Sequence, residues 1–431
     1  MREEDLQRCL EIQALTGSSR PLGQILVEEG VITTEMLDEL LGIQGARRTQ
    51  TVPQALVPGQ DLGRFLQAAV AQGASDLYVS EGSPVMARVA GVLQKMTAEP
   101  IAPPEVWAFV RNLLGENALD LIAEHRTLHS DFQRESLTRG RICAFRHSEG
   151  VGVAIRLHPE HVRPPADTGV PKGFFAALEA NKGLVLVAGE SRSGISETLA
   201  TVVHEVSREK NRIVLVLDAV MEHPLPVDGA VVIRRRVGEH TKSYATGLQA
   251  AMHEAPDVIV VGDLSDPEAF DLALHAAESG RLVVGAVRAR SAVLALQRCL
   301  VPYPAQDLPR MRTMLASLLR AVLAVQLVPD KTKTSMLLAT ELLLVSDAAR
   351  EVMREGNLSQ MNLLVRLNSE FGQSMDSSLI RLVKSGKVKF EDVFHRAEDK
   401  ALVMQAIRGK PAAPPANVLA VGVAPAPTKG A

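Results

Sequence analysis

The hydrophobic pattern divides the chain into parts of different character. Between residues 61 and 165, a helical stretch (LGRFLQAAVAQG) precedes short runs in which apolar and polar residues alternate, such as DLYVS, VMARVAGVLQKM, GRICAFRH and GVAIRLHP. Alternation with a period of two is typical of strands that bury one face. We therefore predict an α+β domain over residues 61–165.

Residues 166–345 follow another pattern, in which apolar runs alternate with amphipathic stretches. The runs KGLVLVAGE, RIVLVLDA, DVIVVGDL and RLVVGAV are apolar along most of their length, and the segments between them place apolar residues at helical spacing. Strands of a parallel sheet are buried on both faces and are joined by helices. This part of the chain is therefore predicted to be an α/β domain.

Four further segments flank these two domains. Residues 1–45 contain two LxxxLxxQ segments and are predicted to form a small helical module, and residues 346–408 are predicted to be all helix. Residues 46–60 have no clear period, which is typical of a linker. The tail, residues 409–431, is rich in proline and alanine and is expected to be disordered.

Composition and charge narrow the function classes. The formal net charge of −3 gives no overall attraction to nucleic acid or to anionic membranes. The three cysteines (Cys9, Cys143 and Cys299) are far apart and lack CxxC spacing, so we expect reduced thiols rather than disulfides or a zinc site. The charged N-terminus does not resemble a signal peptide. We expect a cytoplasmic protein.

One apolar window, Met314–Pro329, needs separate consideration. It is interrupted by Arg320 and is shorter than the ~20 residues that a membrane-spanning helix requires. Any membrane association of the chain is therefore expected to be peripheral.

A phosphate-binding motif lies at the turn after the first predicted strand of the parallel sheet. Residues Gly189 to Ser196 read GESRSGIS, which matches the P-loop pattern GxxxxGK[ST] except that Ile195 replaces the lysine. The remaining residues of the turn, Ser191, Arg192, Ser193 and Gly194, complete the candidate loop. A strand before it and a helix after it would aim backbone amides at a phosphate. An incidental tight turn is the alternative.

The side chains around this turn argue against efficient catalysis. The P-loop lysine neutralises phosphate charge, and isoleucine offers neither a charge nor a donor. Glu190 and Glu197 add two negative charges against the single positive charge of Arg192, so the loop's own charge repels phosphate. ATP binding through the amides and the helix dipole is expected to be weak.

A candidate carboxylate follows about seventy residues later. In DVIVVGDL, an apolar run ends at Asp263, as in the Walker B strands whose acid holds Mg²⁺ or polarises the attacking water. An acid after a buried strand is also a common helix cap, so this assignment depends on the P-loop. Ser196 and Asp263 are the candidate magnesium ligands.

A further cluster consists of Arg234, Arg235 and Arg236. It could be read as a nucleic-acid patch, but no aromatic residues are interleaved for base stacking. We therefore favour a solvated or subunit-facing cluster and expect no nucleic acid partner.

Taken in order, these segments resemble the PilT-type retraction ATPases of type IV pili, within the type II and type IV secretion ATPases. The resemblance covers residues 61 to about 395 and includes GASDLYVSEGSPVMARVAG, SDF, RICAF, AIRLHP, the P-loop region and HEAPDVIVVGDLSDPEAFDLALHAAESGRLVVGAV. AAREVMREGNLSQM and FGQSMDSSL resemble a helical region of the retraction enzymes. The family implies a PAS-like domain, a RecA-like P-loop NTPase core and a ring, usually a hexamer, with ATP between subunits.

The resemblance also implies roles for residues at the site. Asp218 and Glu222 match the family's acidic box, and Arg141 and Arg156 match the arginines that the N-terminal domain supplies to a nucleotide. Several positions depart from the family pattern: Ile195 replaces lysine, Arg192 replaces glycine, Ala219 and Val220 replace aspartate and proline, Asp263 replaces glutamate, and Arg281 and Arg288 replace the two histidines of the histidine box.

Three hypotheses about function follow from this resemblance. The first is a non-hydrolysing structural or regulatory ring subunit, which could share a mixed ring with an active PilT-type paralogue at the inner-membrane platform of a pilus or secretion machine. The second is an active ATPase motor for pilus retraction or secretion, in which Arg192, Arg281 and Arg288 restore the lost charge. The third is a nucleotide-sensing adaptor. Its N-terminal module resembles the cyclic-di-GMP-binding module of some secretion ATPases, but a docking module without a ligand is equally open.

Overall fold

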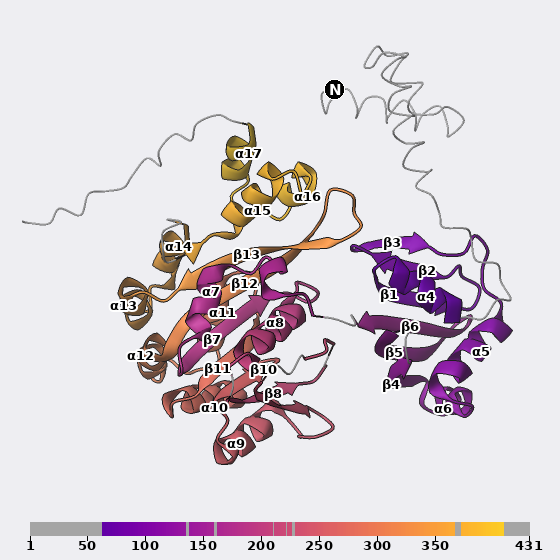
Figure 1. Cartoon of the computed structure of the whole chain (residues 1–431), viewed down its shortest axis with the longest axis horizontal. Coiled ribbons are helices and arrows are strands. Elements are labelled where there is room, and N and C mark those ends of the chain that lie inside the picture. Colours follow the sequence, from indigo (N-terminus) through magenta and orange to yellow (C-terminus); the bar gives the residue numbers. More distant parts are fainter. Residues whose placement is uncertain are drawn as a thin grey trace, which may run out of the picture.

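The computed structural model of the chain describes residues 63–134, 138–158, 162–209, 211–220, 222–225, 229–366 and 372–408. The predicted N-terminal module, the linker and the C-terminal tail lie outside these residues. Figure 1 shows two β-sheets, each with its own helices. Within the described residues, no helix has both the length and the apolar character that crossing a membrane requires.

The first sheet is antiparallel and has six strands in the order β3-β2-β1-β6-β5-β4. The last hairpin pairs with the first strand, which is the strand arrangement of a PAS-like domain. The single strand expected over residues 85–96 is a hairpin, because Ala90 and Gly91 turn the chain with positive φ. The elements are α4 (Gly63–Ala71), β1 (Ala74–Ser80), β2 (Met86–Val89), β3 (Val92–Lys95), α5 (Pro103–Leu114), α6 (Ala118–His125), β4 (Thr127–Arg134), β5 (Thr138–His147) and β6 (Gly150–His158).

The second sheet has eight strands in the order β14-β13-β12-β7-β11-β10-β8-β9. The strands from β12 to β9 pair in parallel, and β13 and β14 are antiparallel additions. The elements are η1 (Pro165–Asp167), α7 (Lys172–Leu178), β7 (Gly183–Gly189), α8 (Ile195–Ser207), β8 (Ile213–Asp218), β9 (Val231–Arg236), α9 (Tyr244–Glu254), β10 (Val258–Val261), α10 (Pro267–Glu278), β11 (Leu282–Arg288), α11 (Ala292–Leu300), α12 (Leu308–Leu318), β12 (Leu319–Pro329) and β13 (Met336–Leu344). The predicted α/β class, with a RecA-like core after an N-terminal α+β domain, is confirmed.

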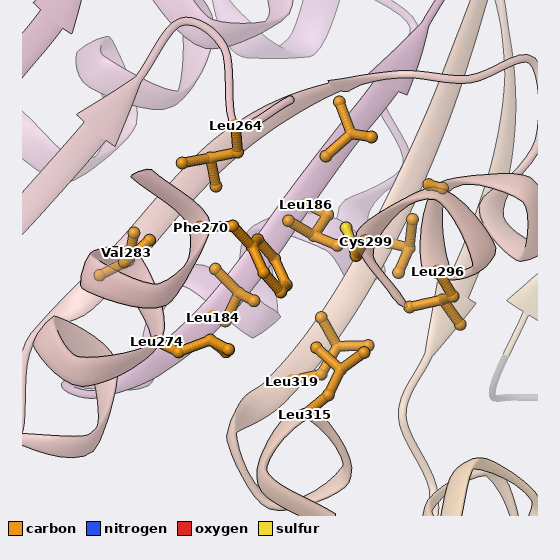
Figure 2. Close-up of a cluster of buried hydrophobic side chains, with 14 of the residues drawn as sticks. Leu184, Leu186, Leu264, Phe270, Leu274, Val283, Leu296, Cys299, Leu315 and Leu319 are labelled. Atoms are coloured by element: carbon orange, nitrogen blue, oxygen red, sulfur yellow. The ribbon is translucent and has the colours of Figure 1, made fainter. Parts of the chain in front are cut away.

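Helices cover both faces of this parallel sheet. Leu184 and Leu186 of β7 point into a core formed with α9 to α12, whereas Val185 and Val187 point into a second core with α7 and α8. Figure 2 shows the first core, in which the fully buried Phe270 of α10 lies beside these leucines. The continuous apolar runs of the sequence arise because each strand is buried on both faces.

The C-terminal region is helical except at one point. The elements are α13 (Asp347–Glu355), α14 (Leu358–Arg366), β14 (Gly372–Gln373), α15 (Met375–Lys384), α16 (Phe390–Phe394) and α17 (Lys400–Arg408). The prediction of all helix is wrong at β14, because these two residues pair with the exposed edge of β13. The apolar window Met314–Pro329 divides between α12 and β12, so no single helix covers it.

The strand registers bring the candidate site residues to one edge of the sheet. Gly189 at the end of β7 lies opposite Arg288 at the end of β11. β10 and β8 run parallel to these strands and end in the segments that carry Asp263 and Asp218. The carboxyl ends of parallel strands form the usual ligand-binding edge of an α/β sheet.

Candidate functional site

The turn between β7 and α8 has the backbone form of a phosphate-binding loop. Gly194 caps α8 with φ of 101°, a conformation that L-residues rarely adopt. At Gly189, a Cβ atom would overlap the hydroxyl of Ser193. The hydroxyl of Ser193 is buried and has no hydrogen-bond partner among the described residues. Both motif glycines are therefore required by the local geometry.

Ile195 is the first residue of α8, where the motif would place its lysine. Its side chain packs against the core shared by β7, α7 and α8. Two of its carbon atoms lie 3.0 and 3.1 Å from the position that a Cβ of Gly189 would occupy. An apolar side chain therefore lies across the start of the loop.

Arg192 occupies a backbone conformation suited to glycine. Its φ is 65°, in the left-handed region, which costs about 1 kcal/mol for a residue with a Cβ. Its side chain is 56% exposed and extends to the N-terminal domain, where Nη2 lies 3.7 Å from Oδ1 of Asp76. The only cation of the loop is thus engaged by a carboxylate of this chain.

Glu197, in the first turn of α8, is neutralised by a residue distant in sequence. Arg163 donates two hydrogen bonds to its carboxylate, at 2.5 and 2.8 Å. The hydrogen bond with Glu197 raises the pKa of Arg163. Counting charges within the loop alone therefore overstates its negative charge, because Arg163, which lies outside the motif, neutralises Glu197.

The acidic residues after β8 lie beside the P-loop serine. Ser196, Asp218 and Glu222 line one narrow pocket of about 30 Å³, together with Gly262 and His223. Burial raises the pKa of Asp218 to about 6. Burial also lowers the pKa of His223. His223 therefore favours its neutral form in this pocket, whereas Asp218 still ionises above about pH 6.

Asp263 lies at the same edge but already has partners. Its Oδ1 accepts hydrogen bonds from the backbone and the hydroxyl of Ser265, at 2.9 and 2.5 Å. Its Oδ2 lies 3.4 Å from Nε of Arg288. The structure thus places Asp263 and Arg288 beside Gly189 and pairs them with each other.

Arg281 is a correction to the predicted site. It precedes β11 at the opposite edge of the sheet, where its carbonyl accepts a hydrogen bond from Gly183 at the start of β7. The length of a seven-residue strand, about 20 Å, separates it from the loop of this chain. Its guanidinium donates to Ser279 and to the carbonyl of Met252. The error arose because the two histidine-box positions flank one strand and therefore lie at its opposite ends.

The two arginines predicted from the N-terminal domain lie on neighbouring strands. Arg156 of β6 lies 3.5 Å from the carboxylate of Glu222, so it does reach the acidic side of the site. Arg141 of β5 pairs instead with Asp131, at 3.2 Å. Both guanidinium groups therefore have carboxylate partners within the chain.

The arginine triplet lies on β9, which was not predicted as a strand. Arg234 donates to the carbonyl of Leu225, and Arg235 pairs with Glu254 at 2.7 Å. Arg236 pairs with Asp131 of the N-terminal domain at 2.5 Å. The triplet therefore makes contacts within the chain.

A hollow of about 610 Å³ opens beside the loop and contains residues that sequence reasoning missed. Its lining includes Glu190 and Ser191 from the loop and three arginines, Arg288, Arg290 and Arg298. Arg290 and Arg298 follow β11 at spacings that match no motif, so no local signal could have identified them. This side of the loop is positively charged.

These residues fit a phosphate group. The glycine cradle, the unpartnered hydroxyl of Ser193 and the start of α8 suit an anion. When bound, ATP would supply a triphosphate for transfer, but the loop offers it no lysine. Across the described residues, no three His, Cys, Asp or Glu side chains gather closely enough to hold a metal ion. Ser196 and Asp263 remain the predicted magnesium ligands.

Comparison with known sequences identifies related proteins over most of the chain. The family described as Type II/IV secretion system protein matches residues 59–363. The type IV pilus retraction ATPase PilT of Pseudomonas aeruginosa is 29% identical over 339 residues, which are 78% of this chain and 98% of that protein. The uncharacterized protein YggR of Escherichia coli is 32% identical over 312 residues, covering 72% of this chain and 94% of YggR.

Solved structures show the same architecture. The structure of the pilus retraction motor PilT with bound ADP has a TM-score of 0.69 and 27% identity, and it covers 80% of this chain and 99% of that one. The ATPase DotB of Legionella pneumophila has a TM-score of 0.72 and 21% identity, with 79% and 97% covered. The latter similarity shows the fold alone.

Proposed function

The chain belongs to the type II/IV secretion system protein family and is a PilT-like type IV pilus or secretion ATPase homologue, and on this premise we propose that it does not hydrolyse ATP. It acts instead as a structural or regulatory subunit of a ring. The proposal rests mainly on Ile195, whose apolar side chain lies over Gly189 at the position of the P-loop lysine.

The other site residues support the same conclusion. Phosphoryl transfer is catalysed by positioning and by stabilisation of developing charge. Arg192 is paired with Asp76, and Asp263 is paired with Arg288. The groups that would stabilise the transition state are therefore absent or engaged.

The decisive experiment measures steady-state phosphate release from the purified full chain, with and without Mg²⁺. PilT of Pseudomonas aeruginosa, prepared in parallel, is the positive control. We expect release from this chain to stay at the level of buffer. Magnesium-dependent turnover of about 1 s⁻¹ or more, the lower end of ordinary enzymes, would overturn the proposal.

The proposed setting is that of the family. We propose a ring, most simply a hexamer, that forms alone or with an active PilT-type paralogue. We place it in the cytoplasm, peripheral to the inner membrane, beside the platform of a pilus or secretion machine. We propose no nucleic acid partner. Co-purification with an active paralogue, followed by native mass spectrometry, tests the mixed ring directly.

A nucleotide-sensing role is the second candidate, and the positive hollow beside the loop favours it. Besides Arg288, which is paired with Asp263, Arg290 and Arg298 give that hollow two more cations against the single carboxylate of Glu190. An anion could therefore bind without being hydrolysed. Calorimetry with ATP, ADP and cyclic-di-GMP tests this role, and an absence of heat with all three would exclude it. Binding of cyclic-di-GMP to residues 1–45 remains a separate hypothesis, because those residues lie outside the described part.

The active-motor hypothesis requires Arg192, Arg281 and Arg288 to replace the lost charge. Within one chain, Arg281 is at the wrong edge of the sheet, and the other two are paired with carboxylates. The phosphate-release experiment distinguishes this motor from the non-hydrolysing subunit.

A further inference from the structure

Lysine is unevenly distributed along this chain. Arginine supplies most of the positive charge, and only 13 of the 47 basic residues are lysines. Five of these lysines lie in two short segments, residues 330–335 and 381–396, and all five are exposed. They are Lys331, Lys333, Lys384, Lys387 and Lys389. Such a cluster in an arginine-rich chain indicates a surface with chemistry of its own.

The fold brings the two segments together. The first is the turn between β12 and β13, and the second runs from α15 through α16. The backbone amide of Lys331 donates a hydrogen bond to the carbonyl of Lys387 at 2.8 Å. Nζ of Lys333 lies 3.9 Å from Oδ1 of Asp392 in α16. The five lysines therefore form one surface, the lysine patch, where the β12–β13 hairpin lies beside α16 (Figure 1).

The lysine patch carries an excess of positive charge. Its two segments contain seven basic residues and three acidic ones. Of the three carboxylates, Asp330 accepts hydrogen bonds from hydroxyl groups of its own turn, and Asp392 pairs with Lys333. Within the described part of the chain, the other four lysines form no ion pair. An exposed excess of one charge repels itself and attracts a polyanion.

Residues 1–45 carry the complementary charge. They contain nine acidic and three basic residues, a formal net charge of −6, whereas the whole chain has −3. The C-terminal tail, residues 409–431, contains two lysines and neither aspartate nor glutamate. Of these two segments, only residues 1–45 are a polyanion that could bind the lysine patch.

The lysine patch lies within reach of this acidic segment. Helix α4, at which the described part of the chain begins, is about 14 Å long. Gly73 follows α4 and lies at the hairpin turn, because the carbonyl oxygen of Thr334 is 4.0 Å from the position that a Cβ of Gly73 would occupy. The 17 residues 46–62, which connect the acidic segment to α4, can span at most about 60 Å. The connection is therefore several times longer than α4.

We propose that the lysine patch is the docking surface for residues 1–45 of the same chain. Carboxylates of the acidic segment bind the lysines of the hairpin turn and of the α15–α16 segment. Charge thus holds the predicted N-terminal module against the C-terminal region. This inference does not depend on whether the chain hydrolyses ATP.

The physical properties of the patch suit a reversible contact. Lysine is a compact, strongly hydrated charge on a flexible stem, so it adapts to carboxylates without a fixed geometry. Each exposed pair is weak and sensitive to salt. Because the acidic segment is tethered, its effective concentration at the patch is of the order of millimolar. Several weak pairs are therefore sufficient for docking.

An anionic membrane is the competing occupant, since clusters of lysines also attract acidic lipids. Helices that lie in a membrane interface additionally insert apolar side chains. Within residues 330–335 and 381–396, no large apolar side chain is exposed. The acidic segment of the chain therefore fits this surface better than a lipid bilayer does.

The first test measures a distance within the full chain. Spin labels are attached to Cys9, in the acidic segment, and to the cysteine of Ser385→Cys, at an exposed position of the lysine patch. Cys143→Ser removes the other accessible thiol, whereas Cys299 is buried and remains. Labelled chains are diluted into an excess of unlabelled protein, so that pulsed electron paramagnetic resonance reports distances within one chain. We expect one narrow distribution that becomes longer and broader in about 1 M NaCl, where the Debye length is only about 3 Å.

Charge reversal identifies the lysines as the cause of this distance. Lys387→Glu combined with Lys389→Glu should lengthen the distribution at low salt. Adding Glu28→Lys and Glu29→Lys to that variant should shorten it again, because opposite charges then meet once more. Thermal unfolding checks that each variant is folded. Should the reversed variant fail to fold, Lys387→Gln with Lys389→Gln removes the charges more gently.

A matched control separates the patch from net charge. Lys182→Glu with Lys242→Glu changes the charge of the chain by the same amount, and both lysines are exposed and lie outside the patch. This control should leave the distribution as it is in wild type. Equal lengthening by the control and by the patch variant would overturn the proposal.

Sedimentation with phosphatidylglycerol vesicles examines the competing occupant. Because residues 1–45 cover the patch, wild type and the patch variant Lys387→Glu with Lys389→Glu should bind the vesicles equally. Binding by wild type that falls tenfold or more in the patch variant would overturn the proposal and assign the patch to a membrane. A narrow distance that disappears on dilution with unlabelled chains would also overturn it, because a second copy would then supply the acidic segment. None of these measurements involves ATP, so the proposed function is judged separately.

Discussion

Replacing Ile195 by lysine tests whether the missing cation is the only defect of the site. The substitution restores the full P-loop pattern from Gly189 to Ser196. Because Ile195 is the first residue of α8 and only partly buried, a lysine can extend from it toward the mouth of the loop. The fold should therefore tolerate the change.

The expected gain in turnover is small. One well-placed group that stabilises developing charge contributes about 10²–10³ in kcat. A site that lacked only the lysine would recover at least that factor. Here Asp263 is held by Ser265 and Arg288, and Arg192 is held by Asp76. We therefore expect less than about a tenfold rise in phosphate release, since correct positioning of the remaining groups is also needed.

The assay compares wild type, Ile195→Lys and Ile195→Met by steady-state phosphate release with and without Mg²⁺. Methionine is unbranched like lysine but carries no charge, so Ile195→Met separates the effect of side-chain shape from the effect of charge. Thermal unfolding of all three checks that the fold is intact. A magnesium-dependent increase above about a hundredfold for lysine alone would refute the reasoning, because the acidic and histidine boxes would then be functional as they stand.

The remaining predictions concern stability. Burial raises the pKa of Glu341 to about 7, above its unfolded value of 4.5. The contribution of this raised pKa to stability is therefore complete below about pH 4.5 and is lost as the pH rises through 7. Glu341→Gln should stabilise the protein at pH 8 by at most about 3 kcal/mol and have no effect near pH 4. Urea unfolding at the two pH values measures this difference. Arg163→Lys removes a bidentate pair and should lower the free energy of unfolding by about 1 kcal/mol, an effect that a double-mutant cycle with Glu197→Gln should abolish. Phe270→Ala should lower it by about 3–5 kcal/mol, whereas Val301→Ala, at a position 78% exposed, should change it by less than about 0.5 kcal/mol.

The sequence was most informative where burial dictates residue type. The runs that became β7, β8, β10 and β11 had to be apolar on both faces, and a parallel sheet was the one arrangement that explained them. By contrast, β9 was missed because it is an edge strand with partly exposed residues and three arginines. β14 was missed because two residues carry no period.

The candidate site was only partly predictable, for a different reason. Gly189, Asp218, Asp263 and Arg288 follow or end parallel strands, so topology alone brings them to one edge. The pairing of Arg163 with Glu197 spans 34 positions in sequence, and no local pattern encodes it. Ion pairs between half-exposed side chains of two domains depend on how those domains pack together. The hydrophobic periodicity of the sequence contains no information about that packing.

Membership of the family and the ability to hydrolyse ATP are therefore separate questions for this chain, because the backbone of the loop and its catalytic side chains are under different constraints. Gly194 takes a positive φ, and a Cβ there would lie 3.0 Å from the side chain of Leu338, so the backbone requires glycine whether or not a nucleotide binds. The lysine position carries no such constraint, since Ile195 gains apolar contact where a lysine would project a charge. Selection for a stable fold alone would therefore keep Gly194 but would allow the residue at the lysine position to change. The backbone of the phosphate loop is thus maintained by packing alone, whether or not the loop serves hydrolysis.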